Sequence, residues 1–95
     1  MDNRKFEKIA KKIVSDWYNQ PERVKATKTL IDESNVFVVW ITKALQNNKA
    51  MLAADTFDGL YFEVTYNGDK QLWHVDVYSK IFNECLEINE EDDDE

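Results

Sequence analysis

Side chains able to carry out catalytic or metal chemistry are few in this sequence. His74 is the single histidine and Cys85 the single cysteine, which excludes a histidine metal pair, a cysteine cluster and an internal disulfide. The two would form a base and a nucleophile only if the last segment brought them into hydrogen-bond reach. A lone cysteine among apolar residues is typically an inert core residue. We therefore expect a protein that is not an enzyme and carries no cofactor and no metal.

Carboxylates that could serve in acid–base catalysis are present, but their spacing does not mark any pair of them as catalytic. Asp55, Glu63 and Asp76 fall on predicted strands, where acidic residues face one another by chance. The chain has two glycines, and a predicted turn accounts for each, so no glycine-rich phosphate loop is indicated. Binding is therefore a better hypothesis for this chain than reaction chemistry.

The length and apolar content indicate one folded domain. The 95 residues suffice for a single core, and 43% of them are apolar, so folding needs no metal or disulfide. The longest apolar run, Val36 to Ile41, is far shorter than the roughly 20 residues that span a bilayer. The charged N-terminal segment has no apolar signal core, so we expect a cytoplasmic protein without membrane contact.

The net charge of −7 is concentrated at the C-terminus. Residues 90–95 supply six of the nineteen acids, and without them thirteen acids face twelve bases. We expect residues 1–88 to form the domain and residues 89–95 to be a disordered acidic tail. Nucleic-acid binding is not expected, because the predicted aromatic face carries acids whereas the lysines lie on the first helix.

The first element is predicted to be an amphipathic helix. Apolar residues recur at steps of three and four from Phe6 to Tyr18. Asp2 or Asn3 caps its first turn, and the helix ends before Pro21, because a residue preceding proline is displaced from helical space. Residues 22–34 are predicted to be a loop with at most one helical turn.

Strand-forming segments fill the rest of the domain, at about 35–45, 50–56, 60–66 and 70–78. Turns between them are indicated by Asn47-Asn48, by a three-residue loop at 57–59, and by Asn67-Gly68, whose two residues both favour positive φ. The predicted fold class is α+β. An N-terminal amphipathic helix packs on a four-stranded antiparallel meander, and a short C-terminal segment follows.

These turns predict which side chains share a face of the sheet. They pair Ile41 with Ala54, Ala54 with Phe62, and Phe62 with Trp73. The face that the helix covers would then consist of large apolar residues: Phe37, Val39, Ile41, Leu45, Leu52, Ala54, Leu60, Phe62, Val64, Trp73, Val75 and Val77.

The opposite face is unusually aromatic for a surface in contact with water. The same pairing aligns Trp40, Asp55, Tyr61 and His74 in one row, with Tyr78 close by. Aromatic faces stack on rings or pack against a partner, while Asp and His hold polar groups. We predict that these five residues form a binding site for a protein partner or a second copy of the chain, with a small nucleotide-like ligand as the alternative.

The C-terminal segment leaves further alternatives open. Ser79 caps a short helix, or the fourth strand simply continues. Ile81, Phe82 and Leu86 would turn the aromatic face into a second small core if they folded over it. In another alternative, the acidic tail acts as a charged decoy.

Several blocks of this sequence resemble one family. They are the stretch Val36 to Trp40, the block from Lys43 to Ala50, the pair Asp58-Gly59 and the run from Glu63 to Lys70. They are similar to small uncharacterised proteins of phages and prophages of Gram-positive bacteria, a domain of unknown function, over roughly residues 5–85. The resemblance implies a mobile-element product that works inside a bacterial host and binds a host or defence protein. It implies no catalytic residues.

Overall fold

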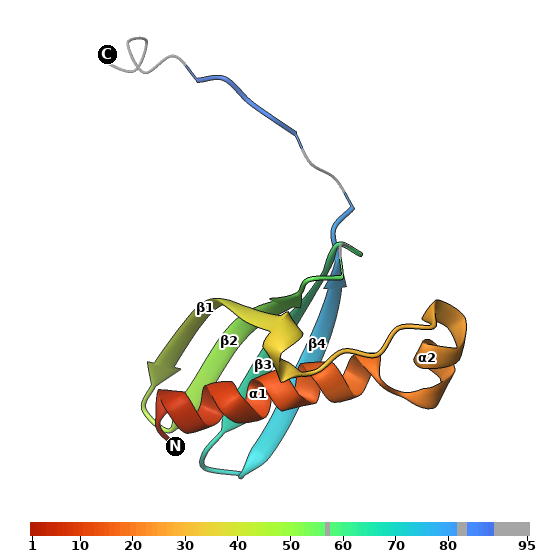
Figure 1. Cartoon of the computed structure of the whole chain (residues 1–95). Coiled ribbons are helices and arrows are strands. Elements are labelled where there is room, and N and C mark those ends of the chain that lie inside the picture. The colour runs from red at the N-terminus through yellow and green to blue at the C-terminus, as the bar shows by residue number, and fades with distance from the viewer. Residues whose placement is uncertain (57, 82–83, 89–95) are drawn as a thin grey trace.

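The computed structural model describes residues 1–56, 58–81 and 84–88 of the chain. The strands form one antiparallel sheet in the order β1-β2-β3-β4, and the helices lie on one of its faces (Figure 1). The predicted α+β fold is therefore confirmed, whereas the predicted disorder of residues 89–95 lies outside the described residues. The elements in chain order are α1 (Asn3–Tyr18), α2 (Pro21–Thr27), the 3-10 turn η1 (Glu33–Asn35), β1 (Val36–Ala44), β2 (Asn47–Ala54), β3 (Leu60–Asn67) and β4 (Leu72–Ser79).

Helix α1 begins and ends where the sequence predicts. The carboxylate of Asp2 accepts a hydrogen bond from the backbone N–H of Lys5 at 2.8 Å, which satisfies one of the free donors of the first turn. Phe6, Ala10 and Val14 are buried, and their spacing of four places them on one face of the helix. This stripe is what α1 contributes to the core.

The segment predicted as a loop contains a second helix, α2, so that part of the prediction is wrong. Pro21 occupies its first turn, where the missing N–H costs nothing. The guanidinium carbon of Arg23 lies 3.7 Å from the ring centroid of Trp17, a cation–π contact that ties α2 to α1. The side-chain amide of Asn19 both donates to and accepts from the backbone of Ile31, which fixes the path back to the sheet.

The core lies between α1 and the centre of the sheet. Leu52, Phe62 and Val64 are completely buried together with the α1 stripe. Phe62 contacts the rings of Trp17 and Tyr18, with centroids 5.0 and 5.4 Å away. These contacts hold the C-terminal half of α1 over β3.

The cover that α1 provides ends at β4. The helix packs against β1, β2 and β3, and from β4 the ring of Trp73 reaches back to stack on Phe6 at 5.4 Å. Val75 and Val77 lie on the same side of the sheet, but they are 39% and 40% exposed. The prediction that they belong to the covered core is therefore wrong.

The first hairpin does not turn at Asn47-Asn48. Leu45 and Gln46 lie between the strands, and Leu45, predicted to be in the core, has φ 57° and is 92% exposed. Asn48 is buried on β2, where its amide nitrogen donates to the backbone oxygen of Met1 and to Oδ1 of Asn3, both at 3.2 Å. The contact with the N-terminus outweighs the turn preference of asparagine.

The last hairpin does not turn at Asn67-Gly68 either. Its turn comprises residues 68–71, and the positive φ, 55°, belongs to Gln71. Gly68 is required for space, since a Cβ there would lie 2.2 Å from the backbone oxygen of Gln46. Phe62 consequently pairs with Val77 and not with Trp73.

The middle loop is longer than predicted, because β2 ends at Ala54 and β3 begins at Leu60. Leu52 rather than Ala54 therefore pairs with Phe62. The predicted left-handed backbone at Gly59 is confirmed, with φ 74°. The predicted pairings of β2 with β3 and of β3 with β4 are displaced by even numbers of residues, so their side chains keep the faces predicted for them.

A bulge in β1 reverses the faces predicted for its first half. Its register with β2 shifts between Val38 and Trp40, so Val39 is an extra residue. Val36 and Val38 pack against the core, whereas Phe37 and Val39 are half exposed. The prediction that Phe37 and Val39 face the helix is therefore wrong.

Replacing Phe62 by alanine should lower the free energy of unfolding by about 3–5 kcal/mol, because a wholly buried ring would leave a cavity. Val77, its cross-strand partner, is 40% exposed, and Val77→Ala should cost about 1 kcal/mol or less. Urea unfolding followed by tryptophan fluorescence measures both losses. Equal losses would contradict a core boundary between β3 and β4.

Candidate functional site on the outer sheet face

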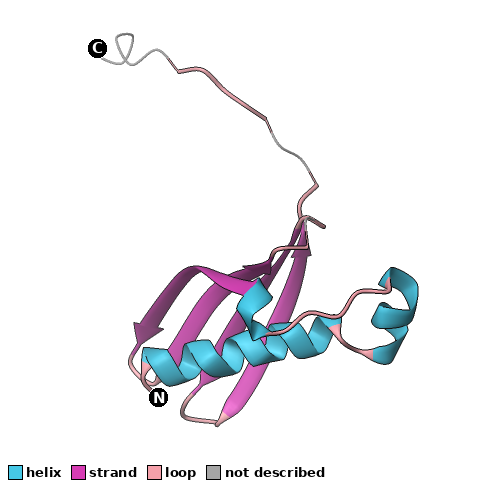
Figure 2. Cartoon of the chain, in the orientation of Figure 1, coloured by secondary structure: helices cyan, strands magenta, loops and turns pink. Residues whose placement is uncertain are grey.

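The outer face is the side of the sheet away from α1, and large apolar side chains are exposed on it. Phe37, Trp40 and Tyr78 are 50%, 40% and 48% exposed, and the bulge adds Val39 beside them. Helix α1 lies across the opposite side of the sheet, and α2 lies beyond its C-terminal end (Figure 2). Exposed apolar surface of this kind usually marks an interaction site.

The described part of the C-terminal segment does not cover the outer face. After Ser79 the chain leads away from the sheet (Figure 1). Ile81, Leu86 and Ile88 are strongly exposed, and residues 84–88 form no helix. Neither the second core nor the helix predicted after Ser79 is found in the described residues, and Phe82 lies outside them. Cys85 is exposed, so its predicted place in a core is also wrong.

The five predicted site residues do not form one row. Tyr61 and Tyr78 are direct cross-strand partners, and this pair stands at the centre of the site. Trp40 instead pairs with Met51. His74 pairs with Thr65, toward the other end of β4. The longer loops and the bulge shift the strands along one another relative to the predicted registers. Four of the five residues still lie on the outer face, but they are no longer neighbours in one row.

Asp55 is the one predicted site residue that does not lie on a strand. It follows the last residue of β2, and its backbone N–H donates to the carbonyl oxygen of Asn35 at 3.0 Å. Its carboxylate accepts a 3.3 Å hydrogen bond from the side chain of Asn35. Asp55 therefore closes the end of the sheet next to η1.

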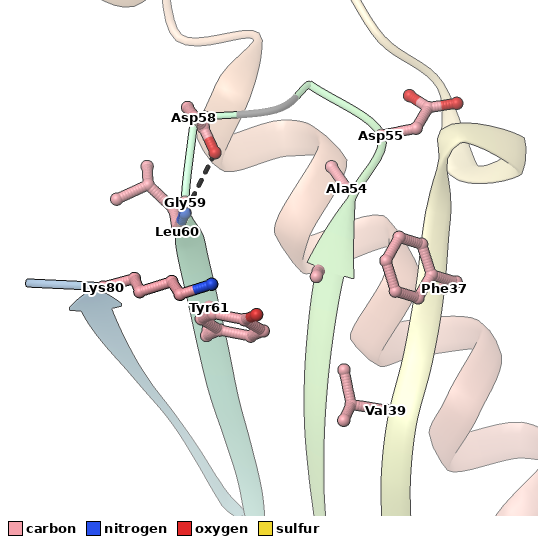
Figure 3. A pocket seen from close by; sticks show the side chains of 10 residues that line it. Phe37, Val39, Ala54, Asp55, Asp58, Gly59, Leu60, Tyr61 and Lys80 are labelled. Carbon is pink, nitrogen blue, oxygen red and sulfur yellow. Dashed lines mark hydrogen bonds between the residues drawn. The ribbon is translucent and has the colours of Figure 1, made fainter. Parts of the chain in front are cut away.

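A hollow of about 530 Å³ opens at this end of the outer face. Ala53 pairs with Phe37 on one side, and Tyr61 of β3 lines the hollow on the other. The rings of Phe37 and Tyr61 stand on either side of the hollow (Figure 3). The methyl group of Ala53 is too small to fill the space beside them. The hollow thus has apolar and aromatic walls with charged groups around it: Asp55, Asp58 and Lys80.

The rim of the hollow is anchored to α1 through Asp58. One carboxylate oxygen accepts a 2.7 Å hydrogen bond from the hydroxyl of Tyr18, and the other accepts from the backbone N–H of Leu60 at 3.0 Å. The Tyr18 hydroxyl also lies 3.2 Å from Oγ1 of Thr56. Asp55 and Asp58 line a second hollow of about 360 Å³ on the side of α1. The loop between β2 and β3 therefore separates two adjoining hollows.

Burial alters the acidity of the tyrosine that holds this loop. Desolvation raises the pKa of Tyr18 to about 12, and the hydrogen bond to Asp58 acts in the same direction. The neutral hydroxyl is therefore retained as the donor to Asp58 at neutral pH.

Acidic residues dominate the centre of the outer face. Glu63 stands directly opposite Asp76, an arrangement of like charges that is unfavourable across a strand pair. Lys49 compensates one of the two, since its Nζ lies 3.3 Å from a carboxylate oxygen of Glu63. Among the described residues, no salt bridge compensates Asp76. Within the same residues, no group of three or more His, Cys, Asp or Glu side chains is placed to hold a metal ion.

Phe37 and Val39 are site residues that sequence reasoning missed. They belong to a run that is apolar on both faces, so alternation could not assign either side. Lys80 and Asp58 were missed because Lys80 follows β4 and Asp58 lies in the loop between β2 and β3. Only the folded chain brings the two together at the hollow. No local signal marks the bulge that exposes the two apolar residues.

One comparison with known proteins identifies relatives of this chain. A family model described as a family of unknown function (DUF6275) matches residues 7–88. No curated protein and no solved structure matches the sequence. Within the described residues, no helix is long and apolar enough to cross a membrane.

Alkaline titration tests the environment of Tyr18. Its folded-state pKa of about 12 exceeds the ordinary value of 10.0, so the unfolded chain releases this proton first. Stability that this group contributes below pH 10 should therefore decline as the pH rises from about 10 to 12. Tyr18→Phe should remove the corresponding step from an ultraviolet phenolate titration. An unchanged titration curve would contradict the assignment.

Proposed function

This chain belongs to the family of unknown function DUF6275, and we propose that it is a non-catalytic protein that binds a protein partner through its outer face. The observation that carries the proposal is that Phe37, Val39, Trp40 and Tyr78 are 40–50% exposed on one uncovered face of the sheet, where Tyr61 also lines the hollow. Large aromatic side chains dominate the energetics of protein interfaces, because they bury much area with few rotatable bonds. Self-association through the same cluster is the alternative for this surface.

The form of the surface supports a protein side chain as the group that binds. A hollow of about 530 Å³ with an alanine floor and aromatic walls can accept one large apolar side chain. Asp55, Asp58 and Lys80 surround it with both signs of charge, which suits the polar rim of an interface. An apolar pocket surrounded by polar groups resembles the apolar core and polar rim of protein interfaces.

The resemblance to phage and prophage proteins supports a setting for this partner. We propose that the protein works in the cytoplasm of a Gram-positive host and that the partner is a host or defence protein. This part of the proposal depends on the resemblance of the sequence and not on the geometry of the outer face.

A small ligand is the second candidate, and the same hollow favours it. Tyr61 offers a ring for stacking, while Lys80 and Asp55 offer charged groups at the rim. These groups suit a nucleotide-like compound that combines a flat ring with polar substituents. Ligand and protein would compete for one site.

Trp40→Ala combined with Tyr78→Ala should abolish capture of the partner and leave the fold intact, because both side chains are exposed. The measurement is affinity capture from a bacterial host lysate, with unfolding curves for each variant. Leu45→Ala is the matched control, since Leu45 is also apolar and exposed but lies in the turn between β1 and β2. A protein captured equally by the double variant would contradict docking at the outer face.

A chain that ends at residue 88 distinguishes, in the same assay, binding by the outer face from binding by the acidic tail. We expect it to retain the partner, because the proposed contacts lie within the domain. If capture required residues 89–95, the protein would instead act as a charged decoy.

Binding of a small ligand would raise the melting temperature. At a concentration 100 times Kd, a ligand adds about 2.7 kcal/mol, or roughly 10 °C or more for a domain of this size. A thermal-shift screen with nucleotides measures this effect, and Tyr61→Ala should eliminate it. A screen without any shift would exclude the second candidate for the compounds tested.

A further inference from the structure

The two edge strands of the sheet differ in how open they are to pairing. Natural edges are usually protected by bulges, prolines or lysines, because unpaired N–H and C=O groups attract other strands. β1 is protected, since the bulge at Val39 bends it and Lys43 lies near its end. β4 has none of these features over its eight residues, and its pairing with β3 is regular throughout.

The backbone groups that β4 presents at its free edge can be assigned. The N–H of Lys80 donates to the carbonyl oxygen of Gly59 at 2.9 Å, directly beyond Leu60 and Ser79, the last pair of β3 and β4. Because antiparallel strands alternate, every second residue before Lys80 also faces β3. Trp73, Val75 and Val77 therefore direct their N–H and C=O groups outward, and no other described strand pairs with them.

In one antiparallel register, the side chains of β4 are complementary to those of β4 in a second copy of the chain. If a two-fold axis passes through Val75, Leu72 faces Tyr78 of the second copy and Trp73 faces Val77. Leu72, Val75, Val77 and Tyr78 are the exposed large apolar residues of this strand, and each would gain an apolar neighbour. Val75 and its copy form a hydrogen-bonded pair at the axis, which matches the outward direction of their backbone groups.

The polar residues of β4 favour the same register. With the axis at Val75, His74 of each copy stands opposite Asp76 of the other, so the carboxylate that lacks a salt bridge within the described chain gains a partner. With the axis at Asp76, two carboxylates would face each other beside Glu63. With the axis at His74, Asp76 would face Leu72.

We propose that two copies of this chain associate through β4 in antiparallel orientation about a two-fold axis at Val75, which forms one continuous eight-stranded sheet. The partner is a second copy because the strand is complementary to itself in its apolar contacts and in the pairing of an imidazole with a carboxylate. The interface shares Tyr78 with the outer-face surface, whereas Phe37, Val39, Trp40 and Tyr61 are not part of it.

A single cysteine at the axis tests the register directly. In a Cys85→Ser background, Val75→Cys should form a disulfide-linked dimer under mild oxidation. The two Cα atoms of a hydrogen-bonded pair lie about 5.5 Å apart, within the roughly 4.4–6.8 Å that a disulfide requires. Reducing and non-reducing electrophoresis measures the linked fraction.

Val77→Cys in the same background is the matched control, because Val75 and Val77 share a face and are almost equally exposed. In the proposed register the two Val77 positions lie about 14 Å apart, so this variant should not link. Equal linking of both variants, or linking of neither, would overturn the proposal.

Exchange of His74 and Asp76 provides an independent measurement. His74→Asp should weaken the dimer about tenfold or more in sedimentation equilibrium, because it places two like-charged pairs across the edge. Adding Asp76→His should restore the dimer by reversing both pairs. Trp40→Ala should leave it unchanged, since Trp40 lies on β1. A monomeric wild-type protein at 100 µM, or a dimer lost with Trp40→Ala, would contradict association through β4.

Discussion

The structure depends on the burial of one apolar helix face against the middle of a four-stranded sheet. A helix is about 10–12 Å wide with its side chains, whereas the axes of the outermost of four strands lie roughly 14 Å apart. One helix therefore covers β2 completely and its neighbours in part. Phe62 is wholly buried, while Val77 opposite to it on β4 is 40% exposed. The position of the helix thus determines where the core ends.

The bulge in β1 has a corresponding effect on the other side of the sheet. An uninterrupted β1 would direct Val39 and Trp40 to opposite faces, but the extra residue leaves both on the outer face. With Ala53 between Phe37 and Tyr61, the surface gains a hollow next to its exposed rings. The same irregularity protects the edge of β1 from pairing. One local deviation therefore shapes the candidate binding surface and leaves β4 as the open edge.

Much of the fold could be predicted because its signals are local. Helix α1 follows from apolar spacing and from Asp2 and Pro21 at its ends, and β1, β3 and β4 follow from runs of β-branched and aromatic residues. Strand β2 has no residue of either kind, and it follows from the turn signals on either side of it. The turns were mispredicted at Asn47-Asn48 and Asn67-Gly68, where contacts distant in sequence outweighed local preference. Asn48 is buried against the N-terminus, and Gly68 is needed where the chain passes close to Gln46.

The candidate site was predicted in composition but not in arrangement. Trp40, Tyr61, His74 and Tyr78 do lie on the outer face, because even displacements of register preserve the face of every residue on β3 and β4. Asp55 lies beyond β2, and Phe37 and Val39 joined the site through the bulge.

Periodicity and turn signals thus settled the type and order of α1 and the four strands, since both are properties of the chain within a few residues, whereas α2 was not predicted. Tertiary packing decided the register, the direction of each β1 side chain, and which apolar residues remain uncovered. Those outcomes depend on contacts between segments that are far apart in sequence and pack into the limited volume beneath one helix. No short stretch of sequence determines such contacts.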